Sequence, residues 1–140
     1  MLRLVLVIAA LLSLSSAQIV TNGDFETGSV SGWSVVGSNR PFVISSYLSL
    51  MPQSGHHFIE TGCLSPGCSG LEQTISLVTG RMYQLTAYYS NNVGGPGQDG
   101  VTFFINGNII AQFGGASYNY VWQRVTATFV APPPPVVFSF

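Results

Sequence analysis

The chain has 140 residues, and charged side chains make up only 6% of them, with no lysine. Its formal net charge is −1 and no basic run is present, so nothing would neutralise nucleic-acid phosphates or attract anionic lipid. The composition therefore argues against nucleic acid as a partner and favours a neutral polar ligand.

The N-terminus has the features of a secretory signal peptide. Arg3 supplies a positive charge, residues 4–14 form an apolar run, and the small residues Ser-Ser-Ala at 15–17 suit cleavage. A run of about 11 residues is shorter than the roughly 20 that a membrane-spanning helix needs. We expect residues 1–17 to be removed, the mature chain to begin at Gln18, and the protein to be secreted to the extracellular space. The alternative is an N-terminal anchor that stays uncleaved.

Residues 18–140 fit a single domain, in which much of the sequence alternates polar and apolar positions. The alternating runs are rich in aromatic and β-branched residues, as half-buried strands are. Asn106-Gly107 is a strong hairpin signal, whereas the prolines at 132–135 should interrupt the sheet. The pattern predicts an all-β chain that forms a β-sandwich. The expected strands cover residues 33–36, 42–48, 57–61, 71–78, 80–89, 101–105, 109–113 and 121–130.

Cys63 and Cys68 enclose a turn-prone sequence in a chain that we expect in an oxidising compartment. We interpret the pair as a disulfide, which would stabilise the fold by about 2 kcal/mol. The alternative is a zinc site that adds His56 and His57. Neighbouring residues of a strand point to opposite faces, which does not suit a closed zinc site.

Several short motifs follow one another along the chain. The sequence Asn-Gly-Asp-Phe-Glu-Thr-Gly at 22–28 precedes Gly-Trp at 32–33, and a Ser-Gly strand start follows at 54–60. Further motifs are Leu-x-Gln-x-Ile with Gly-x-x-Tyr-x-Leu at 71–85, and Trp-x-x-Val-x-Ala-x-Phe at 122–129. Together they resemble the galactose-binding-like jelly roll of secreted carbohydrate-binding modules, over nearly all of the chain after the leader. The resemblance implies a jelly-roll sandwich that binds a glycan.

The chain departs from this family at its C-terminus. Family members close the sheet with one more strand carrying an Asp-Asp-Val-like sequence, whereas this chain stops at Phe140, inside an expected strand. We expect the domain at 18–140 to be truncated. The alternative is an open sheet edge that favours self-association.

The resemblance also implies a structural calcium ion. In the family, an acid of the opening segment and an aspartate of the closing strand hold calcium, which takes six to eight oxygen ligands. Asp24 and Glu26 would be ligands here, together with backbone carbonyls. The alternative is that Asp24 ends a turn while Glu26 accepts hydrogen bonds from loop amides.

Glycan recognition combines aromatic faces that stack on sugar rings with amides or carboxylates that bind hydroxyls. Two Gly-rich stretches, at 91–100 and 114–120, are expected loops, where ligand contacts tend to lie. The alternative is that the tyrosines are ordinary sandwich residues; Trp33, Trp122 and Phe25 are expected in the core. The candidate ligand-binding residues are Tyr118, Tyr120, Asn91, Asn92, Gln98, Asp99, Tyr47 and Tyr88.

No catalytic constellation stands out. The chain has no Gly-x-Ser-x-Gly motif, and a glycosidase would need two facing carboxylates, which the five acids could supply only by chance assembly, for instance Glu60 with Glu72. We therefore expect a secreted, noncatalytic module that binds carbohydrate or extracellular matrix. The alternative is a structural or adhesive secreted protein that associates through its sheet edge and binds no glycan.

Overall fold

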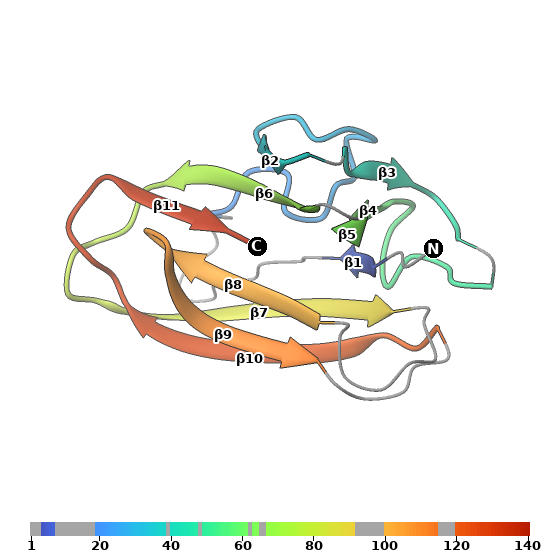
Figure 1. Cartoon of the computed structure of the whole chain (residues 1–140). Coiled ribbons are helices and arrows are strands. Elements are labelled where there is room, and N and C mark those ends of the chain that lie inside the picture. The colour runs from blue at the N-terminus through green and yellow to red at the C-terminus, as the bar shows by residue number, and fades with distance from the viewer. Residues whose placement is uncertain are drawn as a thin grey trace.

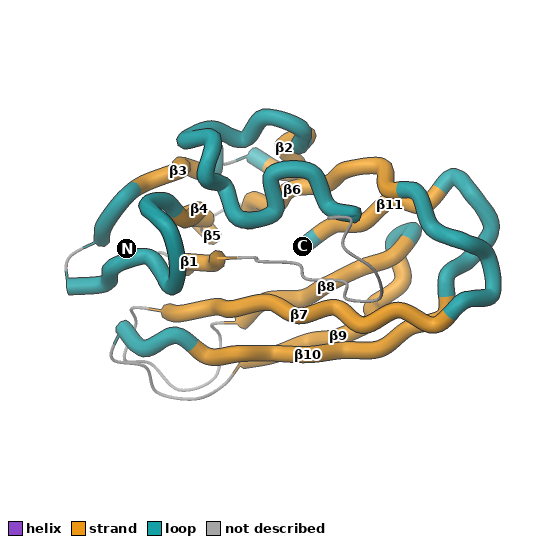
Figure 2. Tube along the Cα trace, turned by 180° about the vertical axis from the view of Figure 1, so that it is seen from behind, coloured by secondary structure: helices purple, strands orange, loops and turns teal. Residues whose placement is uncertain are grey.

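The computed structural model describes residues 4–7, 19–38, 40–47, 49–61, 63–64, 67–91, 100–114 and 120–140. These residues form strands and loops, with no helix among them (Figure 2). Because a helix is absent from the described ranges, none of them holds a helix that could cross a membrane. The all-β prediction is confirmed.

The strands form two sheets in which every pairing is antiparallel (Figure 1). The first sheet has the order β10-β7-β1-β4-β3, and the second has the order β2-β6-β11-β8-β9, with β5 paired to β6. The bounds are β1 (Leu4–Val7), β2 (Ser34–Gly37), β3 (Phe42–Ile44), β4 (Phe58–Thr61), β5 (Cys63–Leu64), β6 (Gly67–Ile75), β7 (Met82–Asn91), β8 (Gly100–Ile105), β9 (Asn108–Gly114), β10 (Gln123–Val130) and β11 (Val136–Ser139).

One hydrophobic core lies between the two sheets. Along β8 the burial alternates strictly, because every second side chain of a strand points to the same face. Trp33 and Phe25 join this core as expected, with their rings stacked 5.8 Å apart, and the Trp33 Nε1 donates a hydrogen bond to the Asn22 carbonyl at 3.1 Å. The strands contribute the buried residues Ile59, Leu85, Ala87, Tyr89, Val125, Leu71, Ile75, Val101, Phe103, Ile105, Val136 and Phe138.

The segment at 21–28 forms consecutive turns, although its motif resembles an opening strand. Asn22 and Phe25 both have positive φ, at 49° and 59°, which is incompatible with a strand. The Asn22 side chain donates to the carbonyls of Ser29 and Ser31, at 2.8 and 3.1 Å, and so stabilises the turn. This arrangement brings Phe25 into the core.

The Asn106-Gly107 hairpin is confirmed. Both residues have positive φ, 49° and 74°, as a type I′ turn requires, and they connect β8 to β9. The prolines at 132–135 separate β10 from β11, also as expected. The expected strand at 42–48 is shorter: it ends at Ile44, and Tyr47 instead forms an isolated bridge with Leu50.

The β5–β6 pairing sets Cys63 directly opposite Cys68. Opposite residues of an antiparallel pair have Cα atoms about 4.5–5.5 Å apart, which is within the range that a disulfide bridges. The backbone register therefore allows the bond, and the disulfide itself stays a prediction.

Residues of the predicted leader form a strand of the first sheet. β1 lies between β4 and β7 and pairs with both of them in antiparallel register. We assigned these residues to a leader and expected no strand there. The apolar run at 4–14 does not alternate between polar and apolar residues, so the sequence carries no signal for a strand at this position.

Candidate functional site

A group of aromatic side chains gathers on the outer face of the first sheet. Ile59 faces the core, so its neighbour Phe58 faces away from the core, by the alternation of a strand. Phe58 and Leu50 are nevertheless fully or almost fully buried, because other side chains cover them. We call this group the aromatic cluster; its members are Leu50, Phe58, Tyr47, Tyr120 and Trp122, with Ile44 packed against it.

A turn and an indole cover Phe58. Tyr47 and Leu50 exchange two backbone hydrogen bonds, at 3.0 and 2.8 Å, and this turn sets Leu50 over the sheet. The Trp122 ring meets the Phe58 ring edge to face, with centroids 5.6 Å apart. Its Nε1 donates to the Met51 carbonyl at 2.8 Å, which ties the start of β10 to the turn. The three outer aromatic residues, Tyr47, Tyr120 and Trp122, remain half-buried, so each residue keeps part of its surface in solvent.

The structure brings together two of the predicted ligand-binding residues. Tyr47 and Tyr120 both belong to the aromatic cluster. Tyr88 lies half-buried on β7, at a position whose alternation with Ala87 and Tyr89 puts it on the same outer face. Asn91 is the last residue of β7, and nothing is described of its side chain. Tyr118, Asn92, Gln98 and Asp99 lie outside the described residues.

Trp122 is one of three members of the cluster, with Leu50 and Phe58, that the sequence did not suggest as ligand-binding residues. We expected it in the core, but it is half-buried and lies on the opposite side of the first sheet from the main core. The signal was present in the alternation of β10. Val125 faces the core, so a residue three positions earlier falls on the other face.

The predicted calcium ligands lie in the opening turn, where Glu26 is already engaged. Its carboxylate accepts the backbone N–H of His56 at 3.0 Å on both oxygens and that of His57 at 2.9 Å. These hydrogen bonds, that from His57 above all, lower the pKa of Glu26 below its ordinary value of 4.5. Gly55 approaches the same carboxylate so closely that a Cβ there would overlap it. Glu26 therefore acts as an acceptor for loop amides, which is the alternative that the sequence left open.

Asp24 makes a local contact. Its Oδ1 accepts the backbone N–H of Glu26 at 3.3 Å, as in an Asx turn. Within the described ranges, no three acidic, His or Cys side chains come together as a metal site. Calcium needs six to eight oxygen ligands, so the described side chains do not form its coordination shell, and the calcium site stays a prediction.

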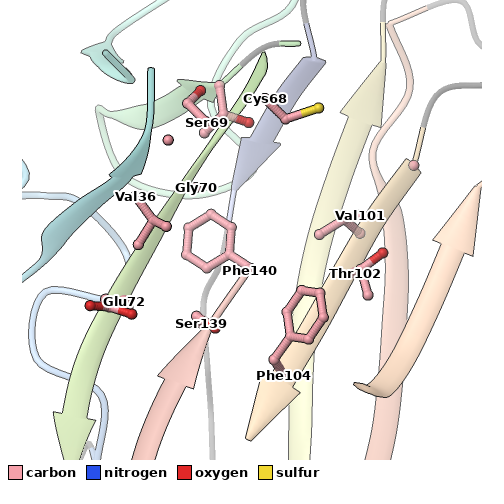
Figure 3. Close-up of a pocket in the computed structure, with 13 residues that line it drawn as sticks. Val36, Cys68, Ser69, Gly70, Glu72, Val101, Thr102, Phe104, Ser139 and Phe140 are labelled. Atoms are coloured by element: carbon pink, nitrogen blue, oxygen red, sulfur yellow. The ribbon is translucent and has the colours of Figure 1, made fainter. Parts of the chain in front are cut away.

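A pocket of about 400 Å³ opens in the second sheet, in line with the end of β11 and between β6 and β8 (Figure 3). Phe140 extends the ladder one residue beyond β11, exchanging two backbone hydrogen bonds of 3.1 Å with Leu71. Its ring lies between the pocket-lining residues of β6 and those of β8, where Figure 3 labels Glu72 and Phe104. Glu60, the other acid considered for catalysis, is on the first sheet, so the two carboxylates belong to different sheets.

The chain was compared with protein-family models, with curated proteins and with solved structures, and none matches it.

Proposed function

We propose that the protein is a secreted, noncatalytic module that binds carbohydrate or extracellular matrix. The observation that carries the proposal is the aromatic cluster, in which the half-buried residues Tyr47, Tyr120 and Trp122 surround the buried Phe58. Exposed aromatic rings held by packing are the groups on which sugar rings stack. A neutral surface also suits a neutral polymer.

Rigid support makes the cluster suitable for binding. The Trp122 indole is fixed by its hydrogen bond to Met51 and by edge-to-face contact with Phe58. A ring that is already ordered loses little conformational freedom when a ligand stacks on it. Each site would bind weakly, because a single stacked ring contributes only about 0.5–1.5 kcal/mol beyond area burial.

We also propose the more detailed features that the sequence suggests. These are a jelly-roll topology, removal of residues 1–17, the Cys63–Cys68 disulfide, and a structural calcium ion near Asp24 and Glu26. The β5–β6 register supports the disulfide. Calcium would need further oxygens beyond Asp24, because hydrogen bonds from two amides engage Glu26.

Changing Tyr120 tests the proposed binding face. We expect Tyr120→Ala to weaken retention on an insoluble polysaccharide about twofold to tenfold, which corresponds to one lost stacking contact. Tyr83→Ala is the matched control, since Tyr83 is also half-buried but stacks on Phe129, outside the cluster. Thermal melts would establish that both variants are folded. Equal losses of retention in the two variants would contradict the assignment of the aromatic cluster as the binding face.

A second candidate function is edge-to-edge association without a glycan. Of the four strands that end the two sheet orders, β2, β3 and β9 carry no charged residue. Charged residues at sheet edges are a usual protection against pairing with other chains. Each of these strands also exposes at least one large apolar side chain, from the set Val35, Val36, Phe42 and Ile109.

Ile109→Lys tests the edge hypothesis. A lysine on β9 would hinder strand pairing, so sedimentation velocity should show smaller species than for the unchanged chain. Val78→Lys is the control, because Val78 is about as exposed as Ile109 but lies between β6 and β7, outside any strand. If both lysines act alike, general hydrophobicity rather than the edge causes the association.

A further inference from the structure

A row of outward-facing side chains crosses the second sheet at the pocket. Glu72 of β6 pairs with Ser139 of β11, and Ser139 pairs with Phe104 of β8. Each of these residues has a strand neighbour in the main core, so its own side chain points to the outer face. All three line the pocket of about 400 Å³, a volume within the range of about 300–1,000 Å³ that small-molecule sites occupy.

The small side chain of Ser139 separates an acid from an aromatic ring. Neighbouring strands lie about 4.8 Å apart, so β6 and β8 are about 10 Å apart on either side of β11. Figure 3 shows Glu72 and Phe104 on opposite sides of Ser139. The Phe140 ring closes the inner side of the pocket, because it packs against the main core and meets the Trp33 ring edge to face, with centroids 5.4 Å apart. The pocket therefore has a carboxylate on one wall and an aromatic ring on the other, with a second ring at its base.

The Glu72 carboxylate lacks a partner in the described part of the chain. It is half-buried, and no described side chain or amide hydrogen-bonds to it or forms an ion pair with it. The described residues that line the pocket include no Arg or His, and the whole chain has no lysine. A carboxylate that is partly removed from water is unfavourable unless it is paired. The pocket therefore favours a ligand that carries a positive charge.

We propose that this pocket binds a small quaternary ammonium compound such as choline. The cationic group lies between the Glu72 carboxylate and the Phe104 ring, with the Phe140 ring beneath it. Aromatic faces attract cations, and quaternary ammonium groups are the ligands that such rings recognise in proteins. A primary amine has three N–H donors to satisfy, which one acid among apolar side chains serves less well. The pocket is on the second sheet, so this proposal does not depend on the aromatic cluster of the first.

Choline and its uncharged isostere dimethylbutanol test the role of charge directly, because the two molecules have the same shape. Each is titrated into the folded, unchanged chain, and binding is followed by NMR chemical shifts. We expect choline to bind about tenfold or more tightly than dimethylbutanol, and to shift the amide signals of Thr102 and Ser139. Equal binding of the two compounds, or no binding of choline, would overturn the proposal without the need for any variant.

Glu72→Gln tests the assigned acid. The substitution keeps the size of the side chain and removes its charge, so choline should bind about tenfold more weakly. Thr74→Val is the control, because Thr74 is exposed on the same face of β6, two residues from Glu72, and does not line the pocket. Choline binding that is equally strong in the two variants would overturn the site.

The same ammonium group occurs in free choline and in the headgroup of phosphatidylcholine. Sedimentation of the chain with phosphatidylcholine vesicles distinguishes these sources. Vesicle binding that free choline reverses, and that Glu72→Gln weakens, would assign the lipid headgroup as the ligand. Binding of choline without binding to vesicles would assign the free compound.

Discussion

At the scale of single residues, Glu26 connects the opening turn to the start of β4. Its carboxylate accepts hydrogen bonds from two consecutive amides, His56 and His57, which lie some thirty positions further along the sequence. Hydrogen bonds to a charged acceptor are stronger than neutral ones. They also favour the ionised carboxylate, and this lowers the pKa of Glu26.

Glu26→Gln should destabilise the fold by about 1 kcal/mol at neutral pH, a modest value because part of the side chain is exposed. A lowered folded-state pKa gives stability that is present above the unfolded-state pKa and is lost as the pH falls through the folded-state pKa. The difference in stability between the unchanged chain and the Glu26→Gln variant should therefore shrink below about pH 4.5. Urea unfolding of both chains at pH 7 and at pH 3 measures this difference in stability. A difference that is the same at both pH values would contradict the role of the charge.

Alanine substitutions at two glycines with positive φ distinguish the cost of backbone strain from the cost of steric overlap. Gly55 and Gly80 have φ of 64° and 77°, but only at Gly55 would a Cβ overlap another group, the Glu26 carboxylate. Gly80→Ala should cost about 1 kcal/mol from the left-handed backbone alone. Gly55→Ala should cost at least about 2 kcal/mol, because it also displaces the hydrogen-bonded carboxylate. Chemical unfolding of the two variants checks the difference, and equal costs would show that the Glu26 contact contributes nothing.

At the scale of elements, the Asn106 side chain adds two hydrogen bonds to the backbone pairing that joins the β8–β9 hairpin to β11. The Asn106 Oδ1 accepts the Val137 N–H at 2.7 Å, and its Nδ2 donates to the Pro135 carbonyl at 3.1 Å. The backbone N–H of Asn106 also donates to the Val137 carbonyl, at 2.9 Å. One turn residue thus fixes where β11 begins after the proline run.

Asn106→Gly separates the conformational role of this residue from its hydrogen bonds. Glycine keeps the positive φ of the turn, so the expected loss of about 1–2 kcal/mol comes from the two missing side-chain bonds. The amide of Val137 should also exchange faster. Asn108→Thr is the control, because the Asn108 side chain makes only a local bond of 3.3 Å within the turn. If the Asn106→Gly chain is as stable as this control, the Asn106 side chain does not hold β11 in place.

The elements also show what the sequence alone can predict. Alternation predicted β4, β7, β8 and β10 to within two residues at each end, because each has one face on the core. The opening turn and the end of β3 were missed, since positive φ values and the Tyr47–Leu50 bridge are not visible in a hydrophobic pattern. Of the aromatic cluster, the sequence suggested Tyr47 and Tyr120 but not Trp122. The Trp122 indole binds the Met51 carbonyl, 71 positions away in the sequence, and no local sequence pattern encodes that contact.

At the scale of the whole molecule, the two sheets have different outer surfaces. The first sheet carries the aromatic cluster, which covers Phe58 on the side away from the main core. The second sheet carries the pocket at the end of β11. Edge strands in both sheets expose apolar side chains. The aromatic cluster is the surface that suits stacking, and the edges are the surfaces that suit strand pairing.

The most direct measurement is retention of the folded chain on a panel of insoluble polysaccharides, with and without soluble competing sugar, in calcium and in chelator. The account predicts retention on at least one polymer that the matching soluble sugar reverses and that Tyr120→Ala weakens while Tyr83→Ala does not. Calcium dependence of that retention would support the metal prediction at Asp24 and Glu26. Absence of retention on every polymer, or retention that no sugar reverses, would contradict the binding-module account.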